Sequence, residues 1–314
     1  MGDPAGIGPE IAALAWRARR PDSAPFLFVG DAARLRAALA RAGVDAPLAP
    51  AGYADAAAIF PDALPVLADF PPDLGEAAAT VAAIERAVAA VRKGAARAVV
   101  TNPISKERLY AVGFRHPGHT EFLGELALRH WGASRAPVMM LWSPTLASVP
   151  VTIHIALEKV KAALTPDLLR ETILTVDADM KSRFGLARPR IAVAGLNPHA
   201  GEGGAMGREE IEIIAPVLET LRARGIDLAG PLPADTMFHA RARARYDAAV
   251  CMYHDQALIP LKTLAFDEGV NVTLGLPFVR TSPDHGTAFD IAGKGIARPD
   301  SLIAALALAD RLSK

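Results

Sequence analysis

The chain has 314 residues and carries 34 Lys and Arg against 34 Asp and Glu, so its formal net charge is zero. This length allows two domains with a sizeable buried core, and the charge balance gives no electrostatic basis for binding nucleic acid or a membrane surface. A single cysteine, Cys251, excludes a disulfide framework, and no apolar run approaches the ~20 residues that span a bilayer. We therefore expect a cytoplasmic protein with neither nucleic acid nor membrane among its partners.

The N-terminal stretch, MGDPAGIGPE, predicts a glycine-rich turn that leads into a helix. Such a turn normally follows a strand, and here only Met1 precedes it. Residues 25–30 then predict a buried strand, and Asp31 is the expected N-cap of a helix that stops at Gly43. This pair is one strand-helix unit.

The same alternation continues along the rest of the chain. Further strands are predicted at residues 97–101, 138–142, 146–154, 190–195, 247–253 and 270–274. Helices are predicted between most of them and at residues 75–93 and 299–312. The alternation predicts an α/β fold with a largely parallel sheet.

Three histidines, His154, His199 and His254, each follow a predicted strand by zero to a few residues. The carboxyl ends of parallel strands meet at one edge of a sheet, where α/β proteins place their sites. Three imidazoles with an open fourth position would hold zinc or another divalent ion. Each could equally be a hydrogen-bonded histidine at a sheet edge, and the pattern leaves both interpretations open.

Several polar residues are candidates for supporting roles around these histidines. Asp235 and Asp255 could orient the imidazole rings, although a surface role fits them as well. Four further residues could bind a phosphate or a carboxylate, or lie in solvated loops: Lys262, Arg280, His119 and Thr120.

The glycine-rich segment after His199 does not match a dinucleotide-binding fingerprint. Gly201 and Gly203 have the required spacing, but Met206 replaces the third glycine, and no acidic residue follows at the expected distance. The sequence also has no Walker motif and no Gly-x-Ser-x-Gly elbow. A flexible loop around His199 is the better interpretation.

Five motifs together resemble the 4-hydroxythreonine-4-phosphate dehydrogenase family of vitamin B6 biosynthesis. They begin at Gly2, Thr101, Pro117, Asn197 and Tyr253, and read GDPAGIGPE, TNPISK, PGHTEF, NPHAG and YHDQ. A sixth stretch, HGTAFDIAGKG at residues 285–295, is similar to the cofactor loop of isocitrate and isopropylmalate dehydrogenases. Those enzymes share the family's fold and lack the dinucleotide fingerprint.

The resemblance implies a two-domain isocitrate/isopropylmalate dehydrogenase-like fold with mostly parallel sheets and a cleft between the domains. The expected cofactor-side domain is discontinuous and comprises residues 1–130 and 275–314. Residues 131–274 are expected to form the metal-binding and dimerisation domain.

The resemblance also assigns roles to individual residues. It makes His154, His199 and His254 the ligands of one divalent ion, Zn, Mg or Co, in a homodimer whose active sites are each shared between the subunits. One arrangement takes His154 from one chain and the other two histidines from its partner. The substrate-binding positions are His119, Thr120, Lys262, Asn271 and Arg280. The positions expected to bind NAD or NADP are His285, Gly286, Thr287, Ala288 and Asp290. The residues expected to support catalysis are Lys262, Asp255 and Asp235.

The implied reaction is the NAD(P)-dependent oxidation of the C3 hydroxyl of 4-phosphooxy-L-threonine, a small phosphorylated substrate. Loss of carbon dioxide would then give 3-amino-2-oxopropyl phosphate. Family relatives with nearly the same motifs oxidise phosphorylated four-carbon sugar acids or cyclic dihydrodiols. A dehydrogenase of 4-phospho-threonate or 4-phospho-erythronate is therefore one alternative, and a non-catalytic, metal-dependent sugar-phosphate binder is another.

Overall fold

The computed structural model describes every residue of the chain except 112, 117, 133 and 134. The chain divides into two compact units, of which unit 1 comprises Met1–Ser134 and Leu276–Lys314 and unit 2 comprises Arg135–Gly275. The functional roles predicted for the two parts of the chain stay predictions. No described helix is long and apolar enough to cross a membrane.

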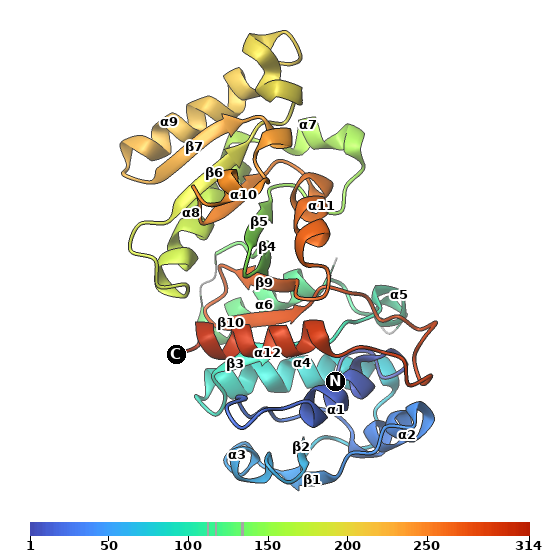
Figure 1. Cartoon of the computed structure of the whole chain (residues 1–314). Helices are drawn as coiled ribbons and strands as arrows, with labels where there is room; N and C mark the ends of the chain where they lie inside the picture. Colours follow the sequence, from blue (N-terminus) through green and yellow to red (C-terminus); the bar gives the residue numbers. More distant parts are fainter. Residues whose placement is uncertain (112, 117, 133–134) are drawn as a thin grey trace. The chain divides into compact units, whose positions relative to one another are not determined.

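Unit 1 contains two pairs of parallel strands covered by helices. β1 (Leu48–Ala51) pairs with β2 (Leu64–Leu67), and β3 (Ala98–Val100) pairs with β10 (Val279–Pro283). The helices of unit 1 are α1 (Gly8–Arg17), α2 (Ala32–Ala42), α3 (Ala56–Ile59), α4 (Glu76–Arg92), α5 (Lys106–Tyr110), α6 (His119–Trp131) and α12 (Asp300–Leu312). α12 packs along β10 and β3 (Figure 1), and the Thr281 hydroxyl donates to the Ala305 carbonyl at 2.8 Å.

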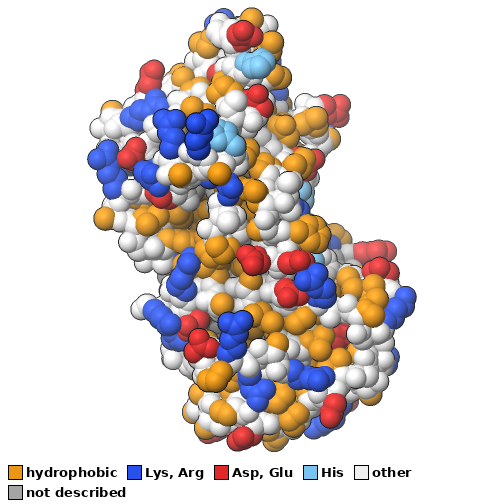
Figure 2. Space-filling model, viewed as in Figure 1, with side chains coloured by type: hydrophobic (Ala, Val, Ile, Leu, Met, Phe, Trp, Pro, Cys, Tyr) orange, Lys and Arg blue, Asp and Glu red, His pale blue; other side chains and the backbone are white. Residues whose placement is uncertain are grey.

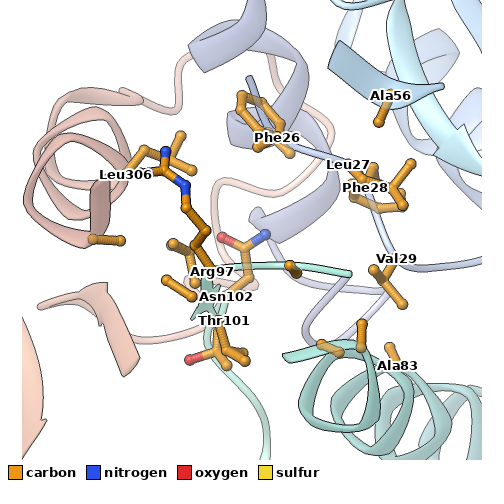
Figure 3. A pocket seen from close by; sticks show the side chains of 18 of the residues that line it. Phe26, Leu27, Phe28, Val29, Ala56, Ala83, Arg97, Thr101, Asn102 and Leu306 are labelled. Carbon is orange, nitrogen blue, oxygen red and sulfur yellow. The ribbon is translucent and has the colours of Figure 1, made fainter. Parts of the chain in front are cut away.

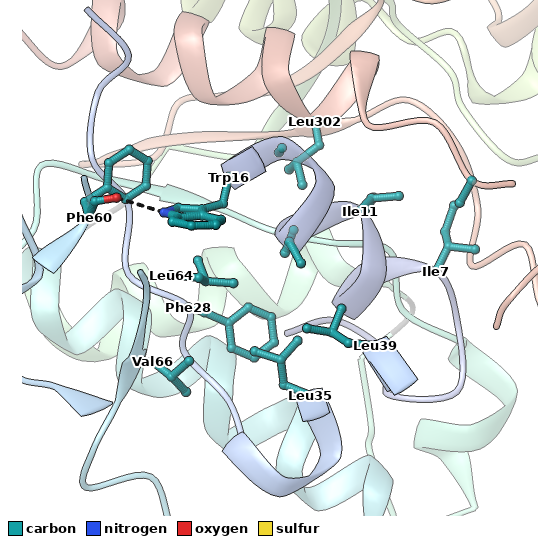
Figure 4. Close-up of a cluster of buried hydrophobic side chains, with 14 residues drawn as sticks. Ile7, Ile11, Trp16, Phe28, Leu35, Leu39, Phe60, Leu64, Val66 and Leu302 are labelled. Carbon is teal, nitrogen blue, oxygen red and sulfur yellow. Dashed lines mark hydrogen bonds between the residues drawn. The ribbon is translucent and has the colours of Figure 1, made fainter. Parts of the chain in front are cut away.

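Local sequence signals account for both ends of α2. The Asp31 carboxylate accepts a hydrogen bond from the Arg34 amide at 2.7 Å, as an N-cap does, and Gly43 ends α2 with a left-handed φ of 64°. The main core of unit 1 packs α1 and α2 on Phe28 and β2 (Figure 4). Within it the Trp16 indole nitrogen donates to the Phe60 carbonyl at 2.8 Å, which satisfies the polar atom of a buried ring.

The strand predicted at residues 25–30 is wrong. Phe28 forms only an isolated parallel bridge with Val66, because no second strand flanks this segment. The Phe28 amide and carbonyl bond to β2, the Val29 carbonyl accepts from the Met1 amino group at 3.0 Å, and Pro25 has no amide hydrogen to donate. A cavity of about 340 Å³ separates this segment from β3 (Figure 3). Its lining is mostly apolar, with Thr101 and Asn102 at one side, and the predicted site residues do not line it.

Unit 2 contains six strands in the order β9-β4-β5-β8-β6-β7. They are β4 (Val138–Ser143), β5 (Leu146–Pro150), β6 (Arg190–Ala194), β7 (Asp227–Leu232), β8 (Ala248–Cys251) and β9 (Val270–Leu274). β5, β8, β6 and β7 run parallel, whereas β4 is antiparallel to both of its neighbours. The predicted α/β class with mostly parallel strands is confirmed.

Helices flank this sheet, and its core is closely packed. They are η1 (Leu157–Lys159), α7 (Val160–Ala163), α8 (Pro166–Ser182), η2 (Pro198–Gly204), η3 (Glu210–Ile214), α9 (Ala215–Ala223), η4 (Ala234–Thr236), α10 (Ala240–Arg243) and α11 (His254–Ala265). α11 packs on β5 and β4 through Leu258 and Leu261. Cys251 is fully buried in the same core, as expected of a small hydrophobic residue.

Basic and acidic side chains are interspersed over the face shown in Figure 2, which agrees with the zero net charge.

Candidate active site

The three predicted metal histidines follow three neighbouring parallel strands of unit 2. In the sheet β8 lies between β5 and β6, with Cys251 beside Pro150 and Val250 beside Val193. The segments that carry His154, His254 and His199 therefore leave the same edge of the sheet. β5 ends at Pro150, earlier than predicted, so His154 lies in a bend after the strand.

Two of these histidines come together within one chain. The ring centroids of His154 and His254 are 5.5 Å apart, and the Nδ1 atom of His254 lies 2.8 Å from Oδ1 of Asp255. A carboxylate at Nδ1 leaves Nε2 to face a metal ion. In the part of the chain that the structure describes, no three His, Cys, Asp or Glu side chains gather closely enough to hold a metal. One chain thus supplies a histidine pair, and His199 lies exposed in η2.

Hydrogen bonds join the three histidine-bearing segments. The Thr152 hydroxyl donates to the Met252 carbonyl at 2.8 Å. The buried Gln256 side chain accepts from the Met252 amide at 2.7 Å and donates to the Gly195 carbonyl at 2.8 Å. Sequence reasoning did not assign Thr152 or Gln256 a role, although Gln256 directly follows the His254-Asp255 pair. Their bonds fix the strand ends from which the histidines project.

The other two residues predicted to support catalysis lie in different elements of unit 2. Asp235 is exposed in η4, which packs against the His199-bearing η2. Lys262 is half-buried in α11, with its ammonium 5.6 Å from the centre of the Phe266 ring. The predicted substrate residue Asn271 lies half-buried in β9.

Unit 1 brings two predicted substrate residues, Arg280 and His119, together. Arg280 lies in β10 and is only 4% exposed, and its Nε and Nη2 atoms donate to the Thr101 hydroxyl at 3.1 and 2.7 Å. Burial lowers the pKa of this guanidinium to about 10, so it remains charged at neutral pH. A buried cation lies next to the first turn of α6.

The protonation of His119 follows from its neighbour. Nη2 of Arg280 is 3.3 Å from Nδ1 of His119, and because a guanidinium only donates, Nδ1 accepts and the ring proton lies on Nε2. Burial, and next the Arg280 charge, hold the pKa of His119 well below its usual range, so the ring is neutral. Its Nε2 is buried and has no hydrogen-bond partner among the described residues. An N–H group is therefore available to a bound acceptor.

His119 and Thr120 are the first two residues of α6, whose free amides and dipole favour an anion. With Arg280 they make a cluster of N–H donors and positive charge, which suits an anion such as phosphate; we call it the anion-binding cluster. Pro117, which belongs to the PGHTEF motif, lies outside the described residues.

The predicted cofactor loop is docked on the N-terminal glycine-rich turn. The Ile7 amide donates to the Thr287 carbonyl at 3.0 Å, and the Gly293 amide donates to the Glu10 carboxylate at 3.2 Å. A Cβ atom on Gly6 would lie 2.8 Å from the Thr287 carbonyl oxygen, so only glycine allows this approach. Two motifs far apart in sequence thus make one structure.

Within this loop His285 also has an open ring nitrogen. Its Nδ1 lies 2.9 Å from the Gly286 carbonyl and so carries the proton, while the buried Nε2 has no partner among the described residues. Ala288 adopts a left-handed φ of 47°, and Gly286 and Asp290 are exposed. The loop offers an unpaired acceptor and small side chains, which suits contact with an adenosine group.

Residues 23–309 match the family model described as "Pyridoxal phosphate biosynthetic protein PdxA". The chain belongs to this family. It is 59% identical over 324 residues to a 4-hydroxythreonine-4-phosphate dehydrogenase of Methylorubrum extorquens (strain PA1), covering all of this chain and 93% of that protein. A Bradyrhizobium diazoefficiens relative of the same name is 58% identical over 330 residues, covering all of this chain and 95% of the relative.

Solved structures of dehydrogenases also align with nearly the whole chain. The crystal structure of 4-hydroxythreonine-4-phosphate dehydrogenase from Klebsiella pneumoniae matches with a TM-score of 0.86 and 40% identity, covering all of this chain and 96% of that chain. A terephthalate 1,2-cis-dihydrodiol dehydrogenase from Burkholderia xenovorans LB400 matches with a TM-score of 0.64 and 30% identity, covering 98% and 95%. The chain is a member of a dehydrogenase family.

Proposed function

We propose that this chain oxidises 4-phosphooxy-L-threonine at its C3 hydroxyl with NAD or NADP, in pyridoxine biosynthesis. When bound, the nicotinamide would accept the hydride from C3, and the hydroxyl proton would be released. The resulting β-keto acid would lose carbon dioxide by breaking its C1–C2 bond, and uptake of a proton at C2 would give 3-amino-2-oxopropyl phosphate. Relatives that align over the whole chain carry the corresponding name.

The observation that carries this proposal is the anion-binding cluster at the start of α6. The buried Arg280 charge, the Nε2–H of neutral His119 and the first amides of α6 all favour the same ligand, an anion with several acceptor oxygens. A phosphate supplies those acceptors. Lys262 and Asn271 are proposed as further contacts to the substrate.

We further propose a divalent ion, Zn, Mg or Co, held by His154 and His254 together with His199. Two imidazoles in one chain, one of them oriented by Asp255, suit such an ion. When bound, the ion would lower the pKa of the substrate hydroxyl and polarise the ketone. Asp235 and Lys262 are proposed to support proton movement and charge balance beside it.

Since one chain pairs His154 with His254, we propose that His199 comes from the other subunit of a homodimer. This differs from the arrangement in which His154 crosses between subunits. Large apolar side chains lie exposed close in sequence to these histidines, including Leu157 at 71% and Phe266 at 73% exposure. Ile155, Ile259, Met206 and Ile211 are exposed as well. A second copy of the chain would cover such residues.

The cofactor is proposed to bind along residues 285–290. The small side chains of this loop allow close approach, and the His285 Nε2 lone pair can accept from an amino group. The proposed position for NAD or NADP is therefore in unit 1, next to the glycine-rich turn.

A second candidate substrate class follows from the dihydrodiol dehydrogenase, which aligns over 98% of this chain at 30% identity. The same cluster could bind a carboxylate instead of a phosphate. Phosphorylated four-carbon acids, 4-phospho-threonate and 4-phospho-erythronate, remain alternatives of the same kind.

A substrate panel separates these possibilities. Metal-loaded protein is mixed with NAD or NADP and with 4-phosphooxy-threonine, 4-hydroxythreonine, 4-phospho-threonate or a cis-dihydrodiol, and absorbance at the reduced nicotinamide band is followed. We expect the first compound to give the highest kcat/KM. Preference for another compound would replace the proposed substrate, and no reduction with any would favour a non-catalytic binder.

A further inference from the structure

The backbone around His199 is left-handed over five consecutive residues. The φ angles of residues 199–203 are 51°, 51°, 78°, 41° and 67°. Only Gly201 and Gly203 adopt this conformation freely, whereas His199, Ala200 and Glu202 carry side chains that disfavour it. Non-glycine residues keep such a conformation only where their surroundings impose it.

A buried group of polar side chains lies directly against this turn. Both oxygens of the Glu210 carboxylate accept from Asn197: Oε1 from its backbone amide at 2.8 Å and Oε2 from its Nδ2 at 2.9 Å. The same Nδ2 donates to Oε2 of Glu209 at 2.7 Å. Glu209 and Glu210 are only 6% and 3% exposed. We call Asn197, Glu209 and Glu210 the clasp.

The clasp fits the turn sterically as well as through hydrogen bonds. A Cβ on Gly201 would lie 2.6 Å from Oε2 of Glu210, and a Cβ on Gly195 would lie 3.0 Å from Oε1. The Glu210 carboxylate therefore occupies the space beside Gly195, just after β6, and beside Gly201 in the turn.

Two adjacent buried carboxylates are costly unless their charges are compensated. Lys161 forms an ion pair with Glu209, and hydrogen bonds from Lys161 and then from Asn197 lower the pKa of that carboxyl to about 2. The Glu210 oxygens receive two N–H donors from Asn197. A glutamine of nearly the same volume would turn an NH₂ group toward one of these donors, so packing alone does not account for a carboxylate here.

Helical geometry also changes at this point. Glu210 begins a single π-helical turn, η3, and such turns occur frequently at functional sites. This turn brings Glu209 and Glu210 to the same asparagine.

From this geometry we infer that Glu210, acting through Asn197, is a positioning residue that holds the left-handed turn and thereby sets the direction of the His199 imidazole toward a divalent ion. The inference rests on the proposed function for the ion. The part that concerns the conformation of the turn is independent of the proposed function and can be measured in metal-free protein.

The first test compares Glu210→Gln with Glu212→Gln, an exposed glutamate of the same helical turn that pairs with Arg208. Hydrogen exchange of the amides of residues 199–206 is measured in metal-free protein, and Co²⁺ affinity is measured by titration. For Glu210→Gln we expect exchange to be at least tenfold faster in this segment alone, and Co²⁺ binding to be about ten- to a hundredfold weaker. The Glu212→Gln protein should match the unsubstituted one in both measurements.

A second pair of variants separates contact with the clasp from backbone strain. Gly201 and Gly203 both have positive φ, but a Cβ on Gly203 would meet nothing within 4 Å. Gly201→Ala should therefore weaken Co²⁺ binding much more than Gly203→Ala, even if Glu210→Gln does not fold.

Unchanged exchange in Glu210→Gln, or faster exchange with unchanged Co²⁺ affinity, would overturn the inference, as would equal effects of the two alanine variants. Failure of the unsubstituted protein to bind Co²⁺ would instead overturn the proposed metal site. The exchange rates would still decide whether the clasp holds the turn.

Discussion

At the scale of single residues, the structure gives Arg280 a role that lysine cannot fill. Its Nε and Nη2 atoms donate hydrogen bonds to the Thr101 hydroxyl, and Nη2 also donates to Nδ1 of His119. An ammonium is a single point charge and cannot reproduce this geometry. Arg280→Lys should lower kcat/KM for the phosphorylated substrate by about ten- to a hundredfold, as the loss of a charge-assisted contact of ~1.5 to 3 kcal/mol implies.

The preference for a phosphorylated over an unphosphorylated substrate should fall by a similar factor. Arg129→Lys, an exposed position in α6, is the matched control and should change neither value. An Arg280→Lys protein with unaltered preference would show that the cluster does not bind the phosphate.

His119 should make stability depend on pH. Its pKa in the folded protein lies well below the ordinary value of 6.5, so the unfolded chain binds a proton in a range where the folded chain does not. The contribution of neutral His119 is complete above the unfolded pKa and is lost as pH falls toward the folded pKa. The slope for one proton is at most ~1.4 kcal/mol per pH unit.

Urea unfolding at about pH 7.5 and about pH 5.5, for the unsubstituted protein and His119→Gln, measures this effect. We expect the free energy of unfolding to fall less on acidification in the variant. An equal or larger fall in His119→Gln would mean that the ring is charged in the folded protein.

Residue identity alone predicted some of these features and not others. His254 next to Asp255 could be read from the sequence, because adjacency guarantees proximity. The carboxylates of Glu209 and Glu210 could not, because they follow an exposed arginine and precede an apolar helix, a pattern typical of solvated residues. Their burial depends on a π-helical turn that propensity does not predict.

At the scale of elements, the contact between the glycine-rich turn and the cofactor loop should be sensitive to one methyl group. Gly6→Ala would place Cβ 2.8 Å from the Thr287 carbonyl oxygen and so displace the loop. We expect the Kd for NAD or NADP to rise about tenfold or more, measured by calorimetry or fluorescence. Gly75→Ala, where a Cβ meets nothing within 4 Å, is the control. Equal cofactor affinity in both variants would remove the loop from the binding site.

Periodicity and caps predicted most elements, and tertiary context decided the exceptions. α2 agrees with its capping and stop signals, which act locally, and α4 and α12 lie within one residue of their predicted bounds. The segment at residues 25–30 has the composition of a strand but has only one strand, β2, beside it, and no local signal carries that property. Likewise β5 stops at Pro150, although the apolar run continues toward His154.

At the scale of the whole molecule, the proposal of a site shared between two subunits predicts complementation between inactive mutants. If His154 and His254 serve one site and the partner supplies His199, then His199→Ala and His254→Ala are each inactive alone. A mixed dimer of the two has one intact site. With random exchange, half the dimers are mixed and half their sites work, so activity should return to about a quarter of the unsubstituted level.

The pair His154→Ala and His254→Ala should not recover, because each damages the site of its own chain. Mass spectrometry confirms that mixed dimers have formed. Recovery from this second pair, with none from the first, would assign the crossing ligand differently. No recovery from any pair would place all three ligands in one chain.

The proposed reaction requires one protein to couple oxidation at C3 to loss of the neighbouring carboxylate. Metal-loaded protein is incubated with NAD or NADP and 4-phosphooxy-L-threonine labelled with ¹³C at C1, and reduced nicotinamide and labelled carbon dioxide are quantified together. We predict that both form in equal amounts and that neither forms without the nicotinamide cofactor. Reduced nicotinamide without labelled carbon dioxide would contradict the decarboxylation, and absence of both products would contradict the proposed reaction as a whole.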